Sequence, residues 1–271
     1  MDAQQGFDFG GARFDFSAET DREVLRFVLS QALFGEATGV YCGRSLYAAE
    51  TLEAAQFYVK QARQELNHLL LFADIFRSLE LTPLEPHWVI RLLAAHNDYY
   101  PLKVLMEHAL GEGMVLDIFR DVLLQTLPED DPRSAGIRKK LQVVCKEEEE
   151  HVAWGEKETR RILAQRPGLA RAFYGLLELQ LWLVPFAVRG LSRRAPEHPV
   201  LKQLPEFVAH VQARVLMQGQ ALGFVAAQRA RGLTRAAAMA RGLLLLVRSQ
   251  FARSKSKLDR RYIEELGFER G

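Results

Sequence analysis

The sequence has little of what marks a secreted, membrane-spanning or disulfide-bonded protein. Two cysteines, Cys42 and Cys145, are too few for a disulfide framework, and this favours buried thiols in a reducing compartment. No run of 18 uninterrupted apolar residues occurs, because the closest window, 173–191, contains charged residues and a proline. The N-terminus lacks the basic start and apolar stretch of a signal peptide. We therefore expect a cytoplasmic protein without a transmembrane segment.

Net charge and nucleotide-binding motifs are also scarce. The chain carries 36 Lys and Arg against 34 Asp and Glu, a formal charge of +2, which argues against a nucleic-acid binder. It contains no Walker loop, dinucleotide fingerprint, CxxC pair or nucleophile elbow. No segment shows sustained two-residue alternation of apolar and polar side chains, so almost no β-structure is expected. What remains is an ordinary globular composition, 48% hydrophobic and 26% charged.

Helical periodicity dominates the first 166 residues. Apolar side chains recur at helical spacing in four long stretches, at about 20–46, 48–79, 101–127 and 134–165. One connection of roughly 20 residues separates the second stretch from the third, and the other links are tight. This pattern predicts an all-α fold with a four-helix bundle over residues 20–166. Residues 1–19 form an N-terminal arm that either docks with its aromatic side chains or stays mobile.

The composition changes after residue 166. Leucine, alanine and arginine become frequent, and further helices are expected at about 168–192, 199–230, 234–256 and 259–266. Neither a clear linker nor a repeat of the first half is present. We interpret residues 167–271 as an additional basic helical region packed on the bundle.

Carboxylates and histidines on the four long helices are the most informative residues. Glu65 precedes His68 by three positions, and Glu148 precedes His151 by three. This spacing puts both side chains on one helix face, within reach of a single metal ion. Chance alone would give roughly 0.6 such pairs in this composition. The placement of the pairs in two separate long helices is therefore the stronger argument.

Each of those two helices follows a helix with a glutamate in an apolar, glycine-flanked setting. Glu36 lies in LFGEATG and Glu112 in LGEGMVLDIF. A buried carboxylate requires a partner or a metal ion that offsets its desolvation. The flanking glycines would permit a close approach of a helix or a substrate. The candidate metal ligands are Glu36, Glu65, His68, Glu112, Glu148 and His151.

In this order the six residues resemble the ferritin-like di-metal carboxylate superfamily. Its four-helix bundle supplies one glutamate from each of two helices and a Glu-x-x-His pair from each of the other two. The resemblance covers about residues 20–166, and the spacings are similar to those of aldehyde-deformylating and other bacterial di-iron oxygenases. It implies two iron ions, or a manganese and an iron ion, bridged by Glu65 and Glu148. His68 and His151 would each bind one ion, and Glu36 and Glu112 would be terminal ligands.

Some positions near these ligands stay open. Glu147 is also one turn from His151 and competes with Glu148 for the ligand role. His108, one turn before Glu112, is a core histidine, a hydrogen-bond donor to a ligand, or an extra ligand. Asp74 and Asp117 are candidates to orient the ligating imidazoles through their second ring nitrogen.

The resemblance implies an oxygen-dependent oxidoreductase with O2 as co-substrate. The expected substrate is a largely apolar small molecule, and the reaction is hydroxylation, N-oxygenation, desaturation or deformylation. The residues beyond the bundle favour this class over iron storage, because a ferritin subunit needs little beyond its bundle. The alternatives are a ferroxidase or iron-handling protein and a metal-free helical interaction module.

The near-neutral net charge hides two oppositely charged halves. Residues 1–166 carry 19 basic and 27 acidic side chains (19 − 27 = −8), and residues 167–271 carry 17 and 7 (17 − 7 = +10). An acidic half that holds the candidate ligands suits cation entry. The basic half is either a solvated face or a contact for an acidic partner. Such a partner would be a carrier protein, a ferredoxin or reductase that donates electrons, or a membrane surface; a homodimer is also compatible with the sequence.

Overall fold

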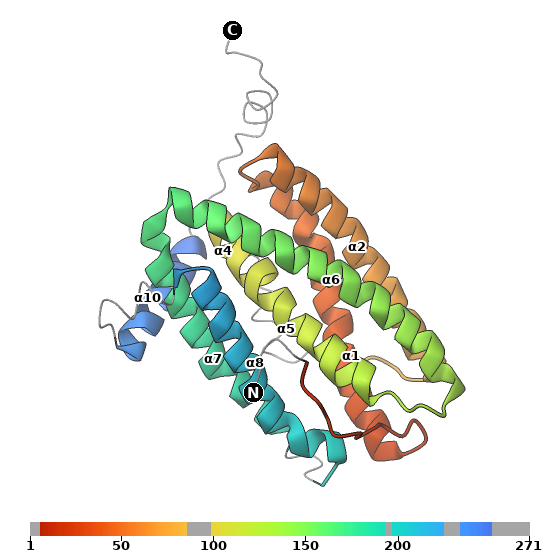
Figure 1. The fold of residues 1–271 in the computed structure, drawn as a ribbon. Helices are drawn as coiled ribbons and strands as arrows, with labels where there is room; N and C mark the ends of the chain where they lie inside the picture. Colours follow the sequence, from red (N-terminus) through yellow and green to blue (C-terminus); the bar gives the residue numbers. More distant parts are fainter. Residues whose placement is uncertain (1–5, 86–98, 193–196, 225–233, 251–271) are drawn as a thin grey trace. The chain divides into compact units, whose positions relative to one another are not determined.

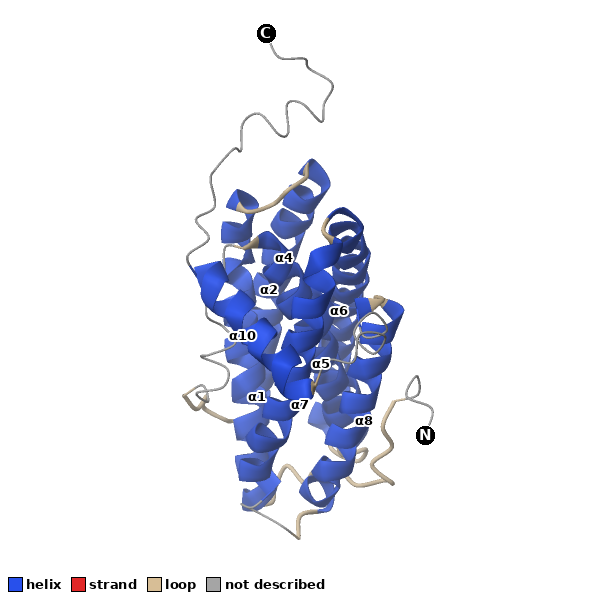
Figure 2. Ribbon diagram, turned by 90° about the vertical axis from the view of Figure 1, so that its left-hand side faces the viewer, coloured by secondary structure: helices blue, strands red, loops and turns tan. Residues whose placement is uncertain are grey.

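The computed structural model describes residues 6–85, 99–192, 197–224 and 234–250, without the side chains of residues 41–44, 184, 186–192 and 250. Within these ranges all regular secondary structure is helical, and Figure 2 shows no strand in them. The predicted all-α class is confirmed. No helix in the described ranges combines the length and the apolar character needed to cross a membrane.

The helical segments are named in chain order in Figure 1. Their bounds are α1 (Glu19–Gly39), η1 (Val40–Tyr47), α2 (Leu52–Ser78), α4 (Tyr100–Lys103), η2 (Val104–Gly111), α5 (Glu112–Asp117), η3 (Ile118–Leu124), α6 (Pro132–Gln165), η4 (Pro167–Leu169), α7 (Ala170–Ser192), α8 (Pro199–Ala221) and α10 (Arg235–Gln250). Segments η1 and η4 are 3-10 helices, and η2 and η3 are π-helices. The expected stretches 48–79, 134–165 and 168–192 match α2, α6 and α7 closely. Of the expected 234–256, α10 covers the described part, and 259–266 lies outside the described residues.

Local capping explains where the two helices with the Glu-x-x-His pairs begin. The Thr51 hydroxyl accepts a hydrogen bond from the Ala54 N–H at 3.1 Å, so α2 starts at the next residue, Leu52. Asp131 accepts from the Arg133 N–H at 2.8 Å, and proline occupies the first position of α6. These caps set the residue at which each helix begins.

The chain from Tyr100 to Leu124 departs from the expected plain helix. It is helical throughout, but two π-helical segments, η2 and η3, flank the short α5. A π turn uses about one residue more than an α turn and therefore rotates the following side chains around the axis. Glu112 is the first residue of α5, directly after such a segment.

By their contacts, the residues divide into two compact units. Unit 1 comprises Met1–Leu25 and Val104–Val247, and unit 2 comprises Arg26–Lys103 and Arg248–Gly271. The boundaries predicted from the sequence at residues 20 and 167 stay a prediction.

In unit 2, α1 and α2 lie side by side (Figure 1). Arg26 Nε donates to the carbonyl of Thr82 at 2.6 Å, and the Leu84 N–H donates to the Ser30 hydroxyl at 2.8 Å. These bonds hold the segment after α2 against α1. The core of this unit includes Leu29, Ala55, Tyr58, Phe72 and Ile75.

In unit 1, α6 packs against η2 and α5, and α7 packs against α8 (Figure 1). The N-terminal arm packs against the rest of unit 1 through its aromatic side chains. This is one of the two arrangements expected from the sequence. Its buried phenylalanines are Phe7, Phe9, Phe14 and Phe16. The Phe7 ring lies 5.7 Å from that of Phe207 on α8, edge to face.

Candidate metal centre

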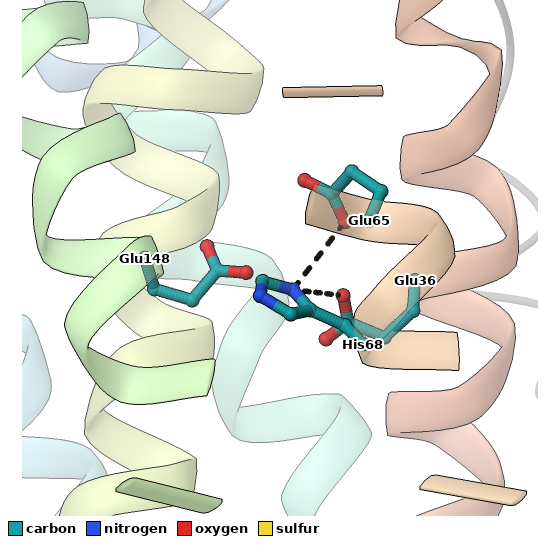
Figure 3. A group of neighbouring side chains, drawn as sticks. All are labelled: Glu36, Glu65, His68 and Glu148. Carbon is teal, nitrogen blue, oxygen red and sulfur yellow. Dashed lines mark hydrogen bonds and ion pairs between the residues drawn. The ribbon is translucent and has the colours of Figure 1, made fainter. Parts of the chain in front are cut away.

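Unit 2 contains three buried candidate ligands, Glu36 on α1 and Glu65 and His68 on α2, called here the unit 2 triad. His68 Nδ1 lies 3.0 Å from Glu36 Oε2 and 3.9 Å from Glu65 Oε2. Figure 3 shows both carboxylates directed toward the same nitrogen of the His68 ring. One ligand atom of each residue lies within 4.8 Å of the others. The triad is therefore compact enough to hold a metal ion.

Two neighbours determine where the Glu65 carboxylate lies. Gln61, one turn earlier on α2, donates from Nε2 to Glu65 Oε1 at 3.2 Å. On α1, a Cβ atom at Gly39 would overlap the carboxyl group of Glu65. Gly39 thus leaves the space that Glu65 occupies. Gly35, also expected to permit close approach, has no neighbouring atom within 4 Å of such a Cβ.

Unit 1 contains the other three candidate ligands, Glu112 on α5 and Glu148 and His151 on α6, called here the unit 1 triad. His151 Nδ1 lies 3.4 Å from Glu148 Oε2 and 3.8 Å from Glu112 Oε1. Burial alone would lower the pKa of His151, but the charge of Glu112, the hydrogen bond to Glu148 and the charge of Glu148 together raise it above its usual value. The imidazole is therefore held in a strongly anionic environment.

His108 joins the unit 1 triad through Glu112. Its Nδ1 lies 3.1 Å from Glu112 Oε1, and its side chain is fully buried, with the ring edge-on to Trp154 at 5.2 Å. The sequence left three roles open for His108, and the structure favours that of a hydrogen-bonding partner of a candidate ligand. Gly155 makes this approach possible, because a Cβ there would lie 2.6 Å from the His108 Cβ. The sequence did not single out Gly155.

Burial separates the glutamates of the run 147–150. Glu148 is buried, Glu147 is half-buried, and Glu149 and Glu150 are exposed. Glu148 is therefore the buried member of this run. Its assignment as a ligand stays a prediction, as do those of the other five candidates.

The expected roles of Asp74 and Asp117 are wrong. Asp74 pairs with Arg77 at 2.6 Å on the surface of α2. Asp117 is buried, and it accepts from Arg214 on α8 at 2.6 Å and from Arg120 at 3.3 Å. Both aspartates therefore bind arginines, and neither orients an imidazole.

The donor chemistry of the two triads fits a divalent cation. Each triad has two carboxylates and one imidazole, oxygen and nitrogen donors that suit iron or manganese. All six side chains are buried, with exposed fractions between 0% and 8%. A single divalent ion balances the charge of two ionised carboxylates, and so offsets the cost of removing them from water. These buried groups can hold a metal ion.

A scan against known protein families finds no match to this chain, and a search of curated proteins finds none either.

Proposed function

We propose that the protein is a non-haem di-metal, oxygen-dependent oxidoreductase that acts on a largely apolar small molecule. The observation that carries the proposal is the burial of all six candidate ligands, which come from two Glu-x-x-His pairs and two further glutamates. Four buried carboxylates carry a charge of −4 when ionised, and two divalent ions carry +4. The proposal therefore explains how these groups are tolerated in helical cores.

The proposed ligand roles follow the resemblance to the ferritin-like superfamily. Glu36, Glu65 and His68 would hold one ion, and Glu112, Glu148 and His151 would hold the other. Two bound ferrous ions, or a manganese and an iron ion, supply electrons to reduce O2 at the site. An external electron donor would restore the reduced state.

Other residues around the two triads would exclude water from the metal site and hold the ligands in place. On α2 the buried residues around the unit 2 triad include Tyr58, Phe72 and Ile75, which make the face on which Glu65 and His68 lie largely apolar. Gln61 and His108 hold the carboxylates of Glu65 and Glu112 by hydrogen bonds. A dry site with fixed ligands suits oxidation of an apolar substrate.

Oxygen consumption by iron-loaded protein tests this function. The purified chain is loaded with Fe²⁺ without oxygen, exposed to O2, and followed by an oxygen electrode and by visible absorption. We expect rapid oxygen uptake that depends on bound iron, by a protein that does not assemble into a hollow shell. Glu148→Gln, which keeps the shape but removes the charge, should slow the uptake strongly.

Two outcomes would contradict the oxidoreductase. A large hollow oligomer that accumulates ferric mineral would favour the ferroxidase alternative. A folded protein that binds no iron would favour the metal-free interaction module.

A further inference from the structure

Helix α10 exposes an apolar face that the metal centre does not explain. Leu243, Leu244 and Val247 are 53%, 47% and 50% exposed. At 100° per residue these three side chains point to the same side of the helix. Ala238 and Gly242, on the opposite side, are buried. Within its described length α10 thus has small buried residues on its inward side and exposed apolar side chains on its outward side.

The inward side of α10 is fixed to α7. A Cβ at Gly175 on α7 would overlap the backbone of Ala238, and a Cβ at Gly242 would overlap the backbone at Gly175, so the two helices touch at small residues. Arg235 Nε binds Glu178 Oε2 at 2.6 Å across the same pair of helices. These contacts fix which side of α10 faces outward.

Positive charge accompanies the exposed leucines. Arg241 and Arg248 are exposed and lie at one flank of the apolar face. Residues 207–258 contain no Asp or Glu but nine Lys and Arg. Apolar side chains flanked by arginines, in a long segment without acidic residues, are typical of helices that lie on anionic membranes.

We propose that α10 docks on the surface of an anionic lipid bilayer, with Leu243, Leu244 and Val247 entering the boundary between headgroups and acyl chains. Arg241 and Arg248 then face the lipid phosphates. A second copy of the chain fits this face less well. Three half-exposed aliphatic side chains supply only a fraction of the ~800 Å² per partner that a stable interface buries, and two arginine-flanked faces repel each other. This proposal does not depend on the metal centre.

Vesicle co-sedimentation of the full chain tests the proposal. The vesicles contain phosphatidylcholine alone or phosphatidylcholine with phosphatidylglycerol. The test variant is Leu243→Gln/Leu244→Gln. The matched control is Leu66→Gln/Leu70→Gln on α2, where the two leucines are 49% and 58% exposed. Glutamine keeps a helix propensity close to that of leucine, so both variants should fold as the wild type does.

We expect the wild type and the α2 control to bind the phosphatidylglycerol vesicles equally, and at least about tenfold more than phosphatidylcholine alone. The Leu243→Gln/Leu244→Gln variant should bind these vesicles about tenfold less than the wild type. In low salt, where charges are least screened, Arg241→Gln/Arg248→Gln should also bind less than the wild type. Three results would overturn the proposal: wild-type protein that does not bind anionic vesicles, an α10 variant that binds as the wild type does, or a wild-type dimer that the α10 variant converts to a monomer.

Discussion

At the residue scale, Gly39 determines where the carboxylate of Glu65 lies. A side chain at position 39 would occupy the space of the Glu65 carboxyl group, while the same change at Gly35 meets no atom within 4 Å. Both glycines lie in α1, and neither has a positive φ that would forbid alanine. Alanine substitutions at Gly39 and Gly35 are therefore matched variants. Both change the stability of α1 in the same way, but only the first displaces the Glu65 carboxylate.

Gly39→Ala should therefore impair metal binding without unfolding the protein. The flexible Glu65 side chain can move away, so stability should be maintained or should rise by about 0.5–1 kcal/mol, as for glycine replaced in a helix. Iron affinity, measured by competition with a chelator, should fall about tenfold. Gly35→Ala should keep the wild-type affinity. Equal affinity in both variants would remove Glu65 from the proposed ligand set.

Cys145 on α6 is a buried thiol with an unusually high pKa. Burial, with smaller contributions from the charges of Glu148 and Glu149, raises its pKa to about 12. The folded chain therefore keeps the thiol protonated, and the stability that this contributes is lost as the pH rises from about 9 through about 12.

Alkylation at pH 8 tests this environment. With a pKa of about 12 the thiolate fraction is roughly 1000-fold smaller than at the ordinary value of 9.0. Iodoacetamide should therefore label Cys145 far more slowly in the folded protein than in urea, as measured by peptide mass spectrometry. Similar rates in both conditions would show that α6 does not bury this residue.

At the element scale, the close contact of α6 with η2 depends on Gly155. A Cβ at this position would lie 2.6 Å from the His108 Cβ and 2.7 Å from the Ala109 backbone nitrogen. Backbone atoms cannot move aside as a flexible side chain can. Gly136, on the exposed side of the same helix, meets no atom within 4 Å.

Alanine at these two positions should change the free energy of unfolding in opposite directions. Gly155→Ala should destabilise the protein by about 1–3 kcal/mol, because α6 and η2 must separate. Gly136→Ala should stabilise it by about 0.5–1 kcal/mol. Urea unfolding followed by circular dichroism measures both. A stabilising Gly155→Ala would mean that α6 and η2 do not approach closely.

Helix ends with strong local signals could be predicted from the sequence, and contacts between distant residues could not. The turn PEDDP before α6 and Pro167 after it mark both ends of that helix. The π segments η2 and η3 were not predicted, because the helical spacing of apolar residues in 101–127 does not distinguish a π-helix from an α-helix. The partner of Asp117, Arg214, is 97 positions away, so local spacing suggested the wrong role. Burial of Glu36 and Glu112 was predictable from their apolar neighbours, but the space left by Gly155 was not.

At the scale of the whole molecule, charge and metal binding are related. All six candidate ligands lie in residues 1–166, the half with a net charge of −8, which attracts cations. The basic half contains α10, which we propose docks on an anionic lipid bilayer. The two triads lie in different units, and each brings two carboxylates to be neutralised.

Metal binding should therefore stabilise the folded chain. Bound metal adds about 2.7 kcal/mol when its free concentration is a hundred times the Kd. Iron or manganese should raise the unfolding temperature, as measured by differential scanning fluorimetry under anaerobic conditions. Magnesium, which prefers oxygen ligands alone, should have a smaller effect. An unfolding temperature that no metal changes would be incompatible with the proposed ligand set.

The metal content of purified protein tests the central claim most directly. After expression in iron-replete medium, elemental analysis should find about two metal ions per chain, iron alone or iron with manganese. Glu65→Ala in unit 2 and His151→Ala in unit 1 should each lose metal. A wild-type protein that is stably folded and carries no metal would contradict the account.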